Sequence, residues 1–102
     1  MRLLVMFDLP VTGFEERRSA VRFRQSLIKD GYNMMQFSIY VRICNGTDDV
    51  NKHIRRLYEN VPDNGSVRCL TVTEKQFEAM HVLTGDLTVA EQSASDFQVT
   101  FF

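Results

Sequence analysis

A short apolar run at residues 2–7 constrains the fold most, because it ends at once in Asp8-Leu9-Pro10. A continuous apolar segment of this length, closed by a proline, predicts a β-strand that is buried on both faces. Such a strand belongs in the interior of a sheet, with other strands along both of its edges. A chain of 102 residues has room for one core of this kind, so we expect a single domain.

Residues 15–30 form the first predicted helix, which ends before a glycine at position 31. Five apolar side chains fall on one arc of this helix and predict the side that faces the core: Ala20, Val21, Phe23, Leu27 and Ile28. Arg17 and Arg24 project into the same arc. We expect them either to snorkel from its edge or to meet an acidic partner near the end of the first strand.

Residues 34–43 alternate with a period of two, which is typical of a half-covered strand or of one bent into two. One set of side chains is Met35, Phe37, Ile39 and Val41. The other set is Gln36, Ser38, Tyr40 and Arg42. We expect the second set to form a polar and aromatic face that is available to a partner.

A second amphipathic helix follows a turn at residues 45–48 and stops at Pro62. Its apolar positions recur at helical spacing: Val50, Ile54, Leu57, Tyr58 and Val61. Its outer, solvated face is expected to carry Lys52, His53, Arg55 and Arg56. A strand over 66–73 comes next, and Thr73 and Gln76 have capping-box spacing for one short helical turn. Residues 79–84 and 97–102 predict two further strands.

This order of elements predicts an α+β fold, a ferredoxin-like βαββαβ sandwich with two helices on one face of an antiparallel sheet. We expect residues 1–86 to form the core and residues 87–102 to form a C-terminal segment. Its strand at 97–102 is the extra C-terminal strand of this prediction. Because that strand has no successor along the chain, it is a candidate for pairing with another chain at a sheet edge.

The sequence favours a cytoplasmic protein with no membrane role. No apolar run is long enough to span a bilayer, and the first residues predict a strand rather than a signal peptide. Cys44 and Cys69 have no metal-binding spacing, and we expect two buried, reduced thiols rather than a disulfide.

The net charge of −1 is the sum of two segments of opposite charge. Residues 17–56 hold nine basic and three acidic side chains, a net of +6, and the remaining residues carry −7. Arginine, which suits bidentate phosphate contacts, outnumbers lysine nine to three. The candidate nucleic-acid-binding residues on the first helix are Arg17, Arg18, Arg22 and Lys29. We expect no aromatic platform to interleave with the basic residues, so duplex backbone contact is expected rather than stacking of single strands.

Several motifs together resemble one family. They are the strand end Met6-Phe7-Asp8-Leu9-Pro10, the helix start Glu15-Glu16-Arg17-Arg18, Gly31-Tyr32, Gln36-Phe37-Ser38-Ile39-Tyr40 and Thr71-Val72-Thr73-Glu74-Lys75-Gln76-Phe77. In this order they resemble the small CRISPR-associated Cas-two proteins, and the last run is similar to the type II branch.

The resemblance implies a ferredoxin-like protomer in a symmetric homodimer, with the C-terminal strand crossing to the partner. It implies a role in spacer acquisition, in which the dimer bridges the Cas-one integrase and holds duplex DNA. Some family members are described as metal-dependent endonucleases acting on RNA or duplex DNA, and Asp8 matches their magnesium-binding carboxylate. The acidic C-terminal third is then free to meet a basic protein partner.

For Asp8 the sequence leaves three roles open. The residue can pair with Arg17 or Arg24, it can bind Mg²⁺, or it can act as a catalytic carboxylate. Metal-dependent cleavage of a phosphodiester usually requires several carboxylates that hold the metal ions. The acidic residues that come next after Asp8 in the sequence, Glu15 and Glu16, are separated from it by a loop. A two-fold axis could instead bring Asp8 from two chains together.

Two further functions stay open beside the role as an acquisition subunit. One is a Mg²⁺-dependent endonuclease (an endoribonuclease or a duplex DNase) that uses Asp8 at the dimer axis. The other is a ferredoxin-like module that regulates through a small ligand and has no affinity for duplex DNA. His53 is expected on the solvated helix face, and His81 has no ligand spacing.

Overall fold

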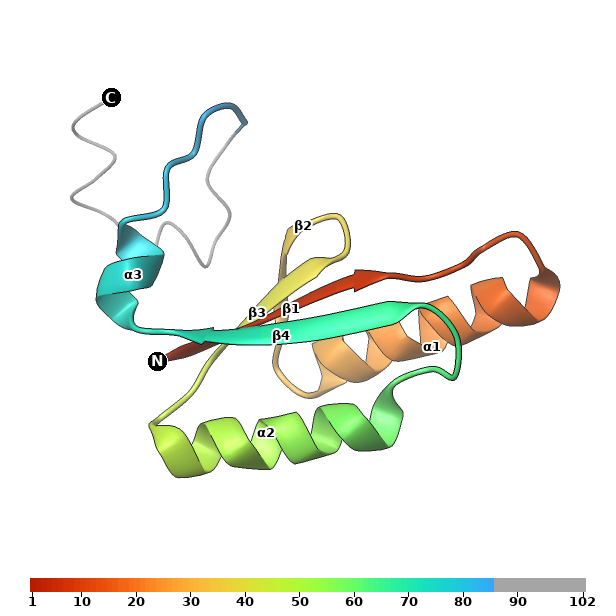
Figure 1. The fold of residues 1–102 in the computed structure, drawn as a ribbon, viewed down its shortest axis with the longest axis horizontal. Coiled ribbons are helices and arrows are strands. Elements are labelled where there is room, and N and C mark those ends of the chain that lie inside the picture. Colours follow the sequence, from red (N-terminus) through yellow and green to blue (C-terminus); the bar gives the residue numbers. More distant parts are fainter. Residues whose placement is uncertain (86–102) are drawn as a thin grey trace.

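The strand at the start of the chain lies inside a four-stranded antiparallel sheet of order β2-β3-β1-β4. The computed structural model describes residues 1–85. Its elements are β1 (Arg2–Asp8), α1 (Phe14–Lys29), β2 (Asn33–Gln36), β3 (Ile39–Ile43), α2 (Thr47–Asn60), β4 (Ser66–Val72) and α3 (Glu74–Glu78). Helices α1 and α2 lie on the same side of the sheet (Figure 1). The predicted α+β, ferredoxin-like arrangement is thereby confirmed. The segment 87–102 and its expected strand at 97–102 lie outside the described residues.

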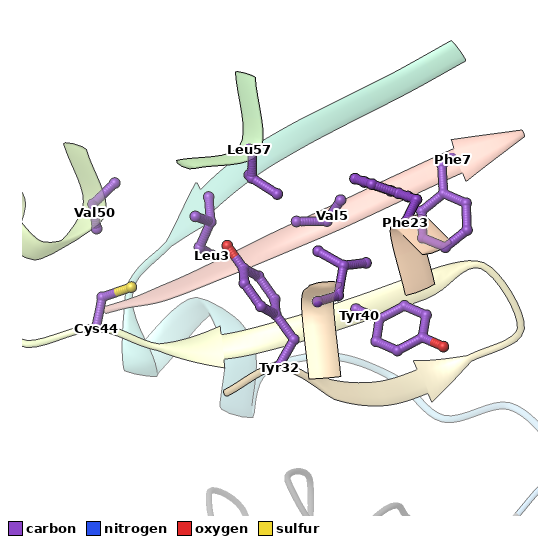
Figure 2. Close-up of a cluster of buried hydrophobic side chains, with 10 residues drawn as sticks. Leu3, Val5, Phe7, Phe23, Tyr32, Tyr40, Cys44, Val50 and Leu57 are labelled. Carbon is purple, nitrogen blue, oxygen red and sulfur yellow. The ribbon is translucent and has the colours of Figure 1, made fainter. Parts of the chain in front are cut away.

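The main core lies between the sheet and the two long helices. Alternate residues of β1 point into it, and Phe7 packs edge-on against Phe23 of α1 with ring centroids 5.2 Å apart. Tyr40 of β3 stacks on the other side of Phe7 at 5.7 Å (Figure 2). The cluster consists of Leu3, Val5, Phe7, Phe23, Leu27, Tyr32, Tyr40, Cys44, Val50 and Leu57.

The opposite face of the sheet, here called the open face, carries a second and smaller apolar cluster. Its buried members are Leu4, Met35, Val41 and Phe77. The expectation that Tyr40 helps to form an available polar and aromatic face is therefore wrong. Tyr40 is paired with Val5 and points with it toward α1 and α2, whereas the side chains of β3 on the open face, Ile39, Val41 and Ile43, are apolar.

The predicted strand at 34–43 is a hairpin of β2 and β3. Its turn contains Phe37 and Ser38, and Ser38 has a φ of 65°, a left-handed conformation that is uncommon for a residue other than glycine. The register shifts between Met34 and Gln36, so a bulge interrupts the alternation. The period of two thus describes two short strands joined by a tight turn.

The apolar arc predicted for α1 is only partly buried. Ala20, Phe23 and Leu27 lie in the core, but Val21 is 50% exposed and Ile28 is 60% exposed. A helix that packs on a sheet along a single line buries residues at i, i+3 and i+7, and flanking residues of the arc stay in solvent. Val21 and Ile28 are such flanking residues.

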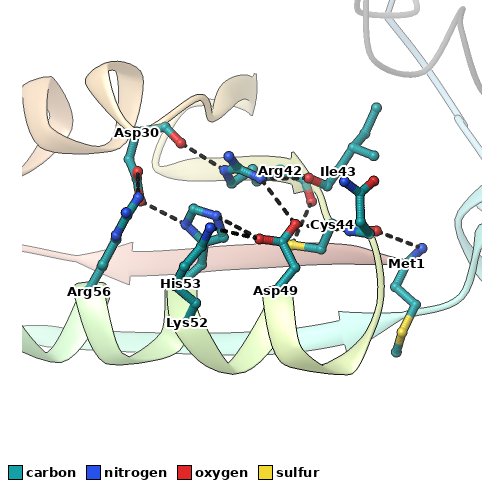
Figure 3. Close-up of polar contacts among 10 residues, drawn as sticks. Met1, Asp30, Arg42, Ile43, Cys44, Asp49, Lys52, His53 and Arg56 are labelled. Carbon is teal, nitrogen blue, oxygen red and sulfur yellow. Dashed lines mark hydrogen bonds and ion pairs between the residues drawn. The ribbon is translucent and has the colours of Figure 1, made fainter.

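His53 is the largest departure from the sequence-based prediction. It was expected on the solvated face of α2, but its side chain has no exposed surface. Its Nδ1 donates to Asp30 Oδ2 at 2.9 Å, and its Nε2 lies 3.3 Å from Asp49 Oδ1 without the geometry of a hydrogen bond (Figure 3). Arg56 Nη1 reaches the other oxygen of Asp30. Helical periodicity could not reveal this, because the acidic partner comes from the end of α1.

α3 closes the end of the sheet where β1 begins. Its N-cap Thr73 and Gln76 form the predicted capping box. The buried Arg2 of β1 donates to Glu74 at 3.0 Å and lies 4.3 Å from the ring centre of Phe77.

The strand expected at 79–84 is absent from the structure of residues 1–85. Ala79 and Met80 instead donate their backbone N–H groups to Lys75 and Phe77 and so complete the end of α3. Cys44 and Cys69 are both free thiols, as expected. Cys44 is buried, but the expectation that Cys69 is buried too is wrong, because Cys69 is exposed. Among the described helices, none has the length and apolar character to cross a membrane.

We predict that His53→Ala destabilises the fold by about 3 kcal/mol, because it removes a buried ring and one of the two side chains that donate to the Asp30 carboxylate. The measurement is urea unfolding followed by circular dichroism. Arg55→Ala on the exposed side of the same helix is the matched control and should change stability by less than about 0.5 kcal/mol. Equal effects of the two substitutions would contradict the buried position of His53.

Acid should weaken the same cluster. Partial burial alone would raise the pKa of Asp30, but the hydrogen bonds from His53 and Arg56 prevail and the pKa lies below its ordinary value of 3.8. The unfolded chain therefore takes up this proton first, and the stabilisation is present above pH 3.8 and lost as the pH falls through the lower folded pKa.

We predict that the urea midpoint falls less steeply between about pH 5 and about pH 3 in Asp30→Asn than in the parent chain. Asp48→Asn, at an exposed site of α2, is the control and should keep the parent slope. The same slope in all three proteins would show that Asp30 does not contribute to acid sensitivity.

Candidate nucleic-acid interface

Asp8 lies at the very end of β1, where the strand leaves the core. Because side chains alternate along a strand and Phe7 points toward the helices, Asp8 points to the open face. The β-ladder pairs it with Ser66 of β4. Gly65 packs against this strand end: a Cβ on it would lie 2.7 Å from the carbonyl oxygen of Asp8, and its φ of 91° is left-handed.

The Asp8 side chain is exposed and makes no ion pair or hydrogen bond within residues 1–85. Of the three roles left open for Asp8, the pairing with Arg17 or Arg24 is therefore excluded. Arg17 donates instead to the carbonyl oxygens of Val11 and Thr12, in the loop before α1. Arg24 points to the β2–β3 turn, where it meets Ser38.

The described residues, 1–85, do not by themselves complete a magnesium site around Asp8. Across the described part of the chain, no three His, Cys, Asp or Glu side chains come together as a group that could hold a metal ion. Glu16 is occupied at the start of α1, where it accepts hydrogen bonds from Thr12 Oγ1 and Gly13 N. These bonds hold the pKa of Glu16 below its ordinary value, so it stays a charged cap. Within residues 1–85, Glu16 is therefore not free to act as a second carboxylate for a metal at Asp8.

The cations predicted to bind nucleic acid lie on the exposed side of α1. Arg18, Arg22 and Lys29 are exposed and form no ion pair within the described residues. A shallow groove of about 480 Å³ runs beside them and is lined by Phe14, Arg17, Arg18, Val21, Arg22 and Gln25. The helix and Asp8 are on opposite faces of the sheet, so the structure separates the two sets of candidate residues.

The basic residues of α2 are less available than the sequence suggests. Arg56 pairs with Asp30 at 2.6 Å, and Lys52 pairs with Asp49 at 3.4 Å. Arg42 of β3 donates to the carbonyl oxygen of Asp30 at 2.7 Å. Much of the positive charge on this side of the fold is therefore used internally, and α1 carries the largest unpaired share.

The structure also places an aromatic residue beside a cation, which the sequence did not predict. Arg24 lies 4.9 Å from the ring centre of Phe37 and 5.4 Å from that of Phe7. Its Nη2 donates to Ser38 Oγ at 3.3 Å. The expectation that no aromatic platform interleaves with the basic residues does not hold at Arg24. The only signal in the sequence was the unexplained place of Arg24 in the apolar arc of α1.

Comparison with known proteins gives one family. The family described as CRISPR associated protein Cas2 matches residues 1–80. A protein of Acidovorax ebreus is 51% identical over 102 residues, which is the whole of both chains. One of Campylobacter jejuni is 41% identical over all of this chain and 71% of its own length. One of Ligilactobacillus salivarius is 42% identical over 83% of this chain and 84% of its own.

All three relatives carry the name CRISPR-associated endoribonuclease Cas2. The family match covers most of the residues whose fold is described above, including Asp8 and the basic side of α1. On these grounds the chain belongs to the CRISPR-associated Cas2 family.

Proposed function

We propose that this chain is a homodimeric subunit of CRISPR spacer acquisition that holds duplex DNA and scaffolds the Cas-one integrase. The unpaired cations on α1 carry this proposal. Arg18, Arg22 and Lys29 are exposed and make no ion pair in residues 1–85, so their full charge is available to phosphates. Contacts of this kind to the DNA backbone carry no sequence information, as the capture of arbitrary DNA requires.

The open face supports self-association. Leu70 of β4 and Ile43 of β3 are each 54% exposed on this face, beside the partly exposed Met6 and Ile39. β4 is also an edge strand, since it pairs only with β1 in the described part of the chain. A second copy that covered these apolar side chains would double the basic surface of α1 across a two-fold axis.

We predict that Arg18→Ala with Arg22→Ala weakens binding of a labelled duplex about ten-fold at 0.1 M salt and does so for every sequence tested. The slope of log affinity against log salt should become shallower by about one for each phosphate that the variant no longer neutralises. Fluorescence anisotropy over a salt series measures both quantities.

Arg55→Ala with Lys75→Ala removes the same charge from α2 and α3 and is the matched control. The control should retain most of the affinity. If the two double variants bind equally well, α1 is not the DNA surface and the proposal falls.

A second candidate function is Mg²⁺-dependent endonuclease activity at Asp8. The observation that favours it is the exposed carboxylate at the end of β1, which no basic side chain of residues 1–85 neutralises. Relatives of 41–51% identity are named endoribonucleases. Asp8 of two copies would hold the ion, and bound Mg²⁺ would stabilise the charge that develops on a phosphodiester.

We predict that Asp8→Asn abolishes Mg²⁺-dependent cleavage of RNA and DNA oligonucleotides but leaves duplex affinity and molecular mass in solution unchanged. Asparagine keeps the size of the side chain and removes the charge that holds the cation. Gel assays with Mg²⁺ or with EDTA measure cleavage. Leu70→Glu, which puts a charge on the open face, should abolish both cleavage and dimerisation.

Spacer integration with the Cas-one protein of the same locus separates the two functions. Integration that survives Asp8→Asn and fails with Arg18→Ala and Arg22→Ala supports the scaffold. The scaffold function as proposed requires no catalysis by Asp8. Loss of integration in Asp8→Asn, with normal duplex binding, would contradict this. Cleavage that persists in Asp8→Asn would exclude Asp8 as the catalytic carboxylate.

A further inference from the structure

The turn between β2 and β3 holds Phe37 out from the surface. The Phe37 side chain is 80% exposed, the highest exposed fraction among the large apolar residues from the start of the chain to the end of β4. The next residue, Ser38, adopts the left-handed φ of 65° that turns the chain. Its carbonyl oxygen accepts a hydrogen bond from Phe7 N at 3.1 Å, which fastens the turn to the end of β1.

The guanidinium group of Arg24 contacts the ring of Phe37. This group lies 4.9 Å from the centre of Phe37 and 5.4 Å from the centre of the buried Phe7, so it contacts both an exposed and an internal ring. The same guanidinium donates to Ser38 Oγ at 3.3 Å. Phe37 is therefore held by one cation–π contact, while most of its surface remains open to solvent.

Several interactions together fix the position of the exposed Phe37 ring. Residues in sparsely populated backbone regions persist where the surrounding structure over-determines them, and such positions cluster at functional sites. Here a left-handed serine, a backbone hydrogen bond and an arginine all act on the position of one exposed ring. An aromatic face with a cation beside it suits a nucleobase, because every base has a π-face and carries a phosphate next to it.

We propose that Phe37 is a stacking site for one unpaired base of a single-stranded nucleic acid, with Arg24 supporting the ring. The turn that carries Phe37 is hydrogen-bonded to Phe7, the residue that precedes Asp8 on β1. A base stacked there would bring its own backbone to the end of β1. The inference deepens the second candidate function by naming single strands as the ligand class, but stacking itself requires no cleavage.

Phe37→Trp tests the proposal directly, because the sequence contains no tryptophan and the new indole is the only one. The probes are RNA and DNA single strands of about twelve nucleotides, and duplexes of the same length, added in EDTA. We expect both single strands, or one of them, to quench the indole fluorescence in a saturable way, and duplexes to leave it unchanged. The RNA and DNA arms show which backbone is preferred.

Two further variants complete the experiment. Tyr58→Trp, at a position of α2 that is 79% exposed, is the matched control and should not be quenched by any probe. Phe37→Leu keeps an apolar side chain without a π-face, and we expect it to weaken single-strand binding about 5- to 100-fold while duplex affinity stays the same.

Three results would overturn the inference. They are equal quenching of the two tryptophans, an unchanged single-strand affinity in Phe37→Leu, and a lower molecular mass of Phe37→Leu in sedimentation, which would place Phe37 in a contact between two copies.

The outcome of this experiment is separable from that of the proposed functions. Quenching without cleavage in Mg²⁺ rejects the nuclease alone, and cleavage that depends on Asp8 without quenching rejects the stacking site alone.

Discussion

The burial of β1 on both faces and its pairing along both edges is the constraint on which the rest of the structure depends. β3 and β4 take up its two edges, α1 and α2 cover one face, and α3 packs against the start of the other. Because residues 2–5 and Phe7 of the strand are buried and both of its edges are paired, the place where it leaves the core is well defined. Asp8 stands at that place, exposed and held in register by Ser66. A carboxylate that rests on a rigid strand end can be presented to a ligand without reorganisation of the fold.

The fold divides its chemistry between the two faces of the sheet. Unpaired cations lie on α1, over the helix-covered face, whereas Asp8 and the exposed Leu70 lie on the open face. This division supports the proposal that one side binds the nucleic-acid backbone and the other a second copy of the chain. The turn with Phe37 is at the boundary, because Arg24 reaches it from α1 while Ser38 is bonded to β1.

Where local patterns and tertiary contacts disagreed, the long-range partner prevailed. His53 reads as a solvated residue because its neighbours in α2 are polar, yet Asp30, 23 positions earlier in the chain, gives it a buried hydrogen-bond partner. Burial of a polar ring is tolerated when such a partner is present. Arg56 of α2 donates to the carboxylate of Asp30, and Arg42 of β3 donates to its backbone carbonyl oxygen. These contacts occupy basic side chains outside α1, so the cations that stay unpaired within residues 1–85 are mainly those of α1. Charge counting cannot foresee this, since ion pairing depends on which helix ends meet.

The sequence by itself determined the order of strands and helices as far as α3, the strand end at Asp8, the capping box at Thr73 and the presence of cations on α1. Each of these follows from spacing between near neighbours, which periodicity and capping chemistry describe well. Only the tertiary structure decided which side chains of α1 are buried, which face of β3 meets the helices, and that Arg24 and Phe37 come together. Those outcomes depend on contacts between segments far apart in the chain, whose geometry is set by how the helices lie across the sheet.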